Sequence, residues 1–166
     1  MRVYFHSYTA CTVYSTLIVL HNATRWLVLL MLLWAIYRSW TGYYRRRDFT
    51  PTDNRIRHWT ATSLHVQLIL GMLLYVESPT VRYFYQFFER VSWSSEAGFF
   101  GWYHIGMMLT AIVTATVVSM KAKRAATARQ QFKVMGRGYA VVLLLLILAI
   151  PWGFSTWVAR AYFRSF

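Results

Sequence analysis

Cysteine and acidic residues are scarce in this chain. Its one cysteine, Cys11, excludes an intrachain disulfide and any metal or iron–sulfur site built from four cysteines. Only five acidic residues stand against 18 lysines and arginines in 166 residues. A glycine-rich phosphate loop, a serine-nucleophile motif and paired carboxylates are also missing from the sequence. The common sequence signatures of stand-alone enzymes are therefore lacking.

Charge is missing from four long stretches, each close to or above the roughly 20 residues that cross a bilayer core. Apolar residues make up 57% of the chain, too many for an ordinary soluble domain. We predict one domain over 1–166, an all-α membrane protein folded as a four-transmembrane-helix bundle. The stretches run from Val3 to Tyr37 (interrupted only by Arg25), from His58 to Val76, from Ala97 to Met120 and from Gly138 to Ala159. The helices should occupy about 17–43, 55–76, 99–120 and 138–158.

The segments between these helices differ in charge. Segments 45–57 and 121–137 are strongly basic, whereas 77–98 is nearly neutral and aromatic, and its part 81–88 could form a short interfacial helix. Basic loops stay in the cytoplasm, which places the N and C termini outside. The same rule accounts for the net charge of +13, so we expect no nucleic-acid partner.

Three histidines and one arginine lie within the predicted spans. His21 and Arg25 are four residues apart and share a helical face, while His65 and His104 lie on the second and third helices. Ionisable groups inside a membrane are costly and are functional-site candidates by default. In the predicted topology His21 and His104 lie at one depth, roughly 6–8 Å below the outer edge, and His65 lies deeper.

A level pair of histidines on different helices suits a haem iron, which two neutral imidazoles approach from opposite faces of the ring. We therefore predict His21 and His104 as metal ligands to haem iron, with His65 as a reserve ligand. Haem propionates need cationic partners, and Arg25 and Arg82 are the candidates.

Other roles for the histidines stay open. Buried histidines in a membrane bundle can simply hydrogen-bond across helices. A catalytic zinc site fits less well, because it usually takes three close ligands and the spans contain no acidic residue. A quinone or lipid site without haem could use His65 and Gln67, although residues two apart do not share a helical face.

Four motifs, in order along the chain, carry a resemblance to a known family. The sequence resembles small four-helix bacterial membrane proteins labelled cytochrome b-like. One departure is Tyr103, because family members commonly have a glutamate before the third-helix histidine. The motifs are Leu20-His21-Asn22-Ala23-Thr24-Arg25-Trp26, Leu64 to Tyr75 with Ser78-Pro79 after it, Tyr103-His104-Ile105-Gly106-Met107-Met108, and Ala149-Ile150-Pro151-Trp152.

The resemblance implies haem b and a multi-pass protein of the bacterial inner membrane. We expect an electron-transfer protein of the respiratory chain, working between quinol and a partner subunit of a respiratory complex. The alternative is a cofactor-free accessory or structural subunit of a larger membrane complex. In both cases we expect an electron-transfer or accessory subunit rather than a stand-alone enzyme.

Overall fold

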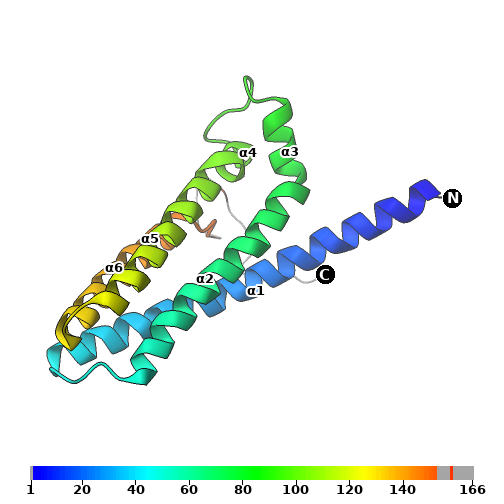
Figure 1. Cartoon of the computed structure of the whole chain (residues 1–166). Coiled ribbons are helices and arrows are strands. Elements are labelled where there is room, and N and C mark those ends of the chain that lie inside the picture. The colour runs from blue at the N-terminus through cyan, green and yellow to red at the C-terminus, as the bar shows by residue number, and fades with distance from the viewer. Residues whose placement is uncertain (1, 153–157, 159–166) are drawn as a thin grey trace.

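A computed structural model describes the backbone of residues 2–152 and 158, and the side chains of 12–152 and 158. The described part is helical, and four long helices or helical stretches form its body (Figure 1). Around the bundle α1 packs on α2, α2 on α5, α5 on α6, and α6 back on α1. This order places α1 and α5 at opposite corners. The long elements are α1 (Arg2–Tyr44), α2 (Pro51–Glu77), α5 (His104–Arg124) and α6 (Ala128–Ala149).

Each of the four long helices or helical stretches is long and apolar enough to cross a membrane. The spans are Thr12–Tyr44, Pro51–Glu77, Glu96–Arg124 and Ala128–Ala149, with mean hydropathies of 1.6, 1.3, 1.6 and 1.9. Large apolar side chains on every span point out of the bundle, among them Leu30, Ile69, Val113 and Leu144. A surface of this kind is stable against lipid and costly against water. The prediction of a helical protein with four spans long and apolar enough to cross a membrane is confirmed.

The helix α1 is longer than the sequence indicates. It begins at Arg2, whereas the apolar run predicts a start near Leu17, and it continues to Tyr44. At 1.5 Å per residue, 43 residues extend about 64 Å, roughly twice the thickness of a hydrocarbon core. Its N-terminal turns extend beyond the other helices (Figure 1).

The first turn of α2 is fixed by its capping residues. Thr50 accepts a hydrogen bond from the backbone of Asp53, and the Asp53 side chain accepts one from the Thr50 backbone, with Pro51 at the first helical position. The helix therefore begins four residues before the predicted Arg55, since charged residues after the cap are still helical.

A short helix α3 (Pro79–Gln86) follows, close to the predicted 81–88, and is capped by Ser78. The next span is built from α4 (Glu96–Gly98), a π-helical segment η1 (Phe99–Tyr103) and α5. It covers 96–124, against the predicted 99–120. Insertions of π-helix are frequent at functional sites. Here the π-helical segment directly precedes His104.

The helix α6 begins ten residues before the predicted start at Gly138 and ends before the predicted Val158. Thr127 caps it by accepting a hydrogen bond from the Gln130 backbone. Its basic residues Arg129, Lys133 and Arg137 are exposed on one stripe, so the helix continues through a charged region. It ends at Ala149, where Ile150 is extended as a residue before proline usually is.

Small residues bring the helices together in the bundle core. Ala111, Ala115 and Ala122 on α5 are fully buried, and a side chain added at Gly138 on α6 would collide with Val118. Close packing of this kind drives helix association in lipid, where the hydrophobic effect does not. The core is lined by larger residues from α1 and α6, including Leu32, Met135, Tyr139 and Val142.

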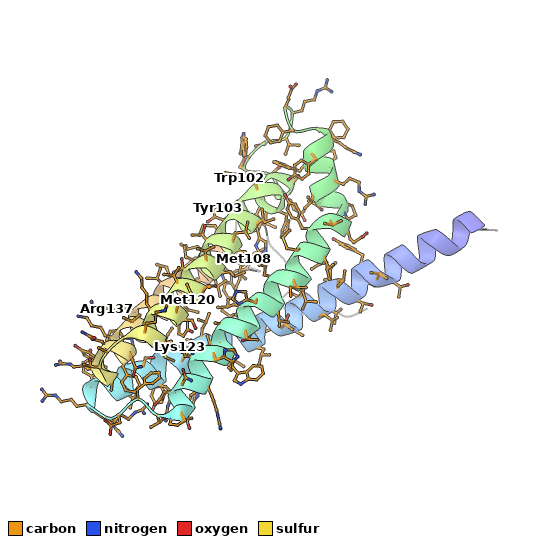
Figure 2. All side chains as sticks on the ribbon, in the orientation of Figure 1. Trp102, Tyr103, Met108, Met120, Lys123 and Arg137 are labelled. Atoms are coloured by element: carbon orange, nitrogen blue, oxygen red, sulfur yellow. The ribbon has the colours of Figure 1, made fainter. Side chains whose placement is uncertain are left out.

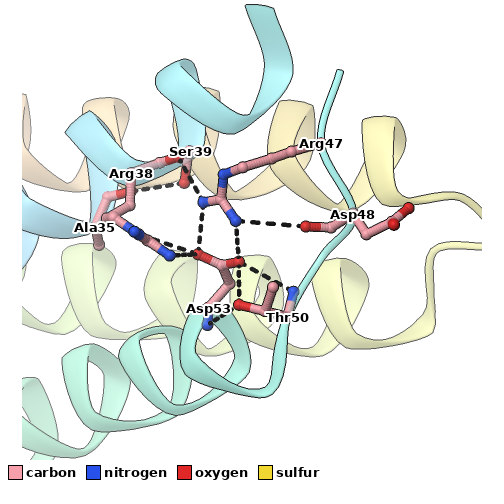
Figure 3. A network of polar contacts seen from close by, with 7 residues as sticks. All are labelled: Ala35, Arg38, Ser39, Arg47, Asp48, Thr50 and Asp53. Atoms are coloured by element: carbon pink, nitrogen blue, oxygen red, sulfur yellow. Dashed lines mark hydrogen bonds and ion pairs between the residues drawn. The ribbon is translucent and has the colours of Figure 1, made fainter. Parts of the chain in front are cut away.

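One end of the bundle carries a buried ion-pair network (Figure 3). Asp53 is fully buried and accepts two hydrogen bonds from Arg47, at 2.6 and 2.8 Å, and two from Arg38, at 2.9 and 3.2 Å. The hydrogen bond from Arg47 to Asp53 raises the pKa of the Arg47 guanidinium above its ordinary value. These contacts join α1, the following loop and α2.

Most of the exposed charge lies at this same end. Lys123 and Arg137 mark it in Figure 2, while Trp102 and Tyr103 lie at the opposite end. The exposed basic residues there come from α2, α5, α6 and the turn after α1: Arg45, Arg46, Arg55, Lys121, Lys123, Arg124, Arg129, Lys133 and Arg137. The two ends of the molecule therefore differ in charge.

Candidate functional site

The end of α6 fixes the orientation of His104. A helix leaves its last four carbonyl groups without intrahelical partners, and Pro151 stops α6 at this point. His104 Nδ1 lies 2.8 Å from the carbonyl oxygen of Ala149. A carbonyl can only accept, so Nδ1 carries the proton and donates it. Nε2 of His104 is then the nitrogen with the free lone pair, the form in which histidine binds metals.

Neighbouring groups complete this cap. The backbone of Ile150 donates to Leu146 at 2.9 Å, and the indole of Trp152 donates to Ile147 at 2.8 Å. The Tyr103 hydroxyl donates to Leu148 at 3.5 Å. Members of the resembling family commonly have glutamate at the position of Tyr103. The Tyr103 hydroxyl therefore binds the Leu148 carbonyl, which is adjacent in the chain to the Ala149 carbonyl that orients His104.

His21 lies on α1, at the corner of the bundle opposite α5, and is held there by the neighbouring helix α2. The side-chain nitrogen of Gln67 donates to the backbone oxygen of His21 at 2.9 Å and lies 3.3 Å from His21 Nδ1. The Thr24 hydroxyl donates to the side-chain oxygen of Gln67. Gly71 packs against the imidazole, since a Cβ there would lie 3.2 Å from His21 Cε1.

His21 and His104 line two cavities that meet at these residues. The two cavities share His21, Asn22, Phe100 and His104 in their walls. The first has a volume of about 140 Å³ and continues between α1, α2 and α3. The second has a volume of about 90 Å³ and continues toward α6, Ile150 and Pro151.

The walls of both cavities are mainly apolar, with a few polar groups. Tyr14, Tyr75, Ser78 and Thr80 lie in the wall of the first cavity, and Gln67 in that of the second. Phe99 and Phe100 pack against the His104 ring, with centroids 5.9 and 5.8 Å away. Such a lining suits a flat apolar ligand with polar edges.

The two arginines predicted as propionate partners differ in position. Arg25 lines the second cavity, with its guanidinium 5.4 Å from the Trp26 ring. Arg82 lies on α3 and lines a separate surface hollow with Tyr85 and Gln86. That hollow shares only Tyr75 and Val81 with the first cavity. Arg25 is therefore part of the histidine site, and Arg82 lies next to it.

His65 is at a different level and is engaged elsewhere. Its Nδ1 donates to the carbonyl of Ala61 at 2.7 Å, and its Nε2 lies 3.2 Å from the hydroxyl of Thr116 on α5. Thr116 is twelve residues beyond His104, about 18 Å along the helix. Both ring nitrogens thus have hydrogen-bond partners, and His65 appears in the wall of neither histidine-lined cavity.

These contacts bear on the quinone and zinc alternatives. Gln67 contacts His21 and Thr24 on α1, whereas His65 contacts Ala61 and Thr116, so the two side chains have different neighbours. Within the described residues, no three His, Cys, Asp or Glu side chains come together as a possible metal site. The importance of Gln67 to His21, and of Ala149 to His104, was missed in the sequence because both are contacts between distant segments.

The chain matches no protein-family model, no curated protein and no solved structure. The resemblance to cytochrome b-like membrane proteins therefore remains a prediction from the four motifs.

Proposed function

We propose that the protein is a haem-b membrane protein that transfers electrons between quinol and a partner subunit of a respiratory complex. The observation that carries the proposal is the pair His21 and His104, which come from opposite corners of the bundle and line both cavities. Haem is the metal group that suits such a pair. Its macrocycle supplies four nitrogen ligands, so the protein needs to supply only two.

The shape of the site supports the same proposal. A flat ring with its iron between the two histidines needs space on both sides of the pair. One cavity extends from the pair toward α3 and the other toward α6. The histidines would hold the iron, and Phe100 and the apolar walls would contact the ring.

The cofactor would supply one-electron chemistry, and the protein would set its potential and exclude water. Arg25 is the cation that lines the site, so it would pair with a propionate and favour the reduced iron by its charge. His104 enters the site as the proton-bearing Nδ1 form fixed by Ala149, which is ready for ligation through Nε2.

The charge distribution supports an orientation in the bacterial inner membrane. The end with the exposed basic residues would face the cytoplasm, and the histidine site would lie toward the outer side with both termini. An electron acceptor or partner subunit would then approach from the outside. Quinol would reach the site from the bilayer.

A second candidate is a cofactor-free accessory subunit of a larger membrane complex. The N-terminal turns of α1 extend beyond the other helices (Figure 1), which would suit packing on another subunit. In that case the protein would co-purify with larger subunits in mild detergent and bind no haem.

Haem binding tests the proposal directly. The protein, expressed with ample haem and purified in mild detergent, should show a Soret band and about one haem per chain. His58 is exposed on α2, so His58→Ala is the matched control and should keep full haem content. Absorbance from aromatic residues alone, after expression with ample haem, would rule the proposal out.

A further inference from the structure

Both the nitrogen and the oxygen of the Gln67 side-chain amide have hydrogen-bond partners at the histidine site. It is 9% exposed, and its nitrogen contacts the backbone oxygen and the Nδ1 of His21. Its oxygen accepts from the Thr24 hydroxyl. The amide therefore joins α1 to α2 through three groups of α1.

The orientation of this amide follows from its partners. The His21 backbone oxygen can only accept, so the group 2.9 Å away from it must be the NH₂ of Gln67. The second hydrogen of that NH₂ is available to Nδ1 of His21, whose nitrogen lies 3.3 Å from the amide nitrogen. Nδ1 must then accept, and the ring proton of neutral His21 is on Nε2.

His21 and His104 therefore have opposite tautomers. Nδ1 of His104 donates to Ala149, which leaves the lone pair on Nε2. In His21 the lone pair is on Nδ1, where the Gln67 amide already covers it. A metal is bound by a deprotonated ring nitrogen, so His104 is ready to bind and His21 is not.

We infer that Gln67 is a positioning residue that decides whether His21 can bind a metal. This inference rests on the proposed haem site. For His21 to bind through Nε2, one proton leaves Nε2 and one is taken up at Nδ1, so the imidazole stays neutral. The amide of Gln67 then rotates by half a turn and accepts the Nδ1 proton with its oxygen.

After the rotation, the Gln67 amide keeps hydrogen-bond partners for both groups but gains one unfavourable contact. Its NH₂ would donate to the Thr24 oxygen, because the Thr24 hydroxyl can donate to the Leu20 carbonyl, 2.8 Å away. Its oxygen, however, would lie against the backbone oxygen of His21, and two acceptors repel each other. His21 is consequently the weaker of the two ligands, and His104 binds first.

The test compares the native residue with Gln67→Glu and Gln67→Met. The carboxylate of Gln67→Glu can only accept and should move the His21 proton to Nδ1. Gln67→Met has a similar length without hydrogen-bonding groups and should leave a mixture of tautomers. Nitrogen-15 NMR of the ring nitrogens, in the full chain without haem, distinguishes the three. We expect the Nε2–H form of His21 in the native protein and the Nδ1–H form in Gln67→Glu.

Haem titration provides the second measurement. Gln67→Glu should bind haem b about three- to tenfold more tightly, the value of one hydrogen bond. It should also lower the midpoint potential, because an acceptor at Nδ1 makes the imidazole a stronger donor to oxidised iron. Its haem should keep the same absorption bands as the native protein.

The outcomes separate this inference from the proposed function. An Nδ1–H form of His21 in the native protein, or the same tautomer in all three proteins, would overturn the role of Gln67. If Gln67→Glu does not fold, the native spectrum and Gln67→Met still decide the matter. Absence of haem binding in every variant would refute the haem site alone, since the tautomers are measured without haem.

Discussion

Replacing Asp53 by alanine should be among the most damaging single changes at the basic end of the bundle. Asp53 is fully buried, while the side chains of its partners Arg38 and Arg47 are 29% and 26% exposed. Asp53→Ala leaves two guanidinium groups without their carboxylate and removes half of the Thr50 capping box (Figure 3).

The magnitude follows from these contacts. Breaking a buried ion pair by removing one partner costs about 3–5 kcal/mol. The arginines can still turn toward water or headgroups, which lowers that part to about 2–3 kcal/mol. Loss of the hydrogen bond from the Thr50 backbone to the Asp53 side chain adds about 1 kcal/mol. The total of about 3–4 kcal/mol corresponds to a fall in melting temperature of about 10 °C for a chain of this length.

Thermal unfolding followed by circular dichroism in lipid nanodiscs measures this loss. The matched control is Asp48→Ala, which removes the same charge from the same loop at an exposed position. It should change the melting temperature by at most 1–2 °C. Adding Arg47→Met to Asp53→Ala should restore part of the stability, because one uncompensated charge is removed. Equal melting temperatures for Asp53→Ala and Asp48→Ala would refute the reasoning.

Three further predictions concern the histidine site. Gly71→Leu should abolish haem absorbance while the melting temperature stays near that of the native protein, because the new side chain meets His21 across the first cavity; paired optical and unfolding measurements check it. Arg25→Met should lower the haem midpoint potential by roughly 50–100 mV in a redox titration, since a unit charge within about 10 Å stabilises reduced iron by ~1–2 kcal/mol. Pro151→Ala should weaken haem binding about three- to tenfold in a haem titration, because α6 can continue and its own backbone competes with His104 for the Ala149 carbonyl.

The sequence is sufficient to predict the four spans but not all of their ends. Charge-free runs of about 20 residues identify helices that cross a membrane. The same rule places the start of α6 at Gly138, because it treats Arg129, Lys133 and Arg137 as loop residues. These side chains are exposed on a helical stripe, so the helix begins at Ala128. Long basic side chains reach water from within a helix, and their charge does not mark its end.

The sequence is sufficient to bring the two histidines of the candidate site together, but not to identify the groups that contact them. Depth arithmetic places His21 and His104 at one level, and they line the same cavities, with His65 at another level. Their identity as haem ligands is still a prediction. Gln67 and Ala149 could not be assigned to their histidines, because these hydrogen bonds join residues 46 and 45 positions apart. No local pattern reports such contacts.

The central claim is that His21 and His104 bind one haem iron. Reduced-minus-oxidised spectra of the purified native protein and of three alanine variants test it most directly. We predict a low-spin b-type spectrum in the native protein and in His65→Ala, and its loss in His21→Ala and His104→Ala. Loss in His65→Ala together with retention in His104→Ala would contradict the assignment.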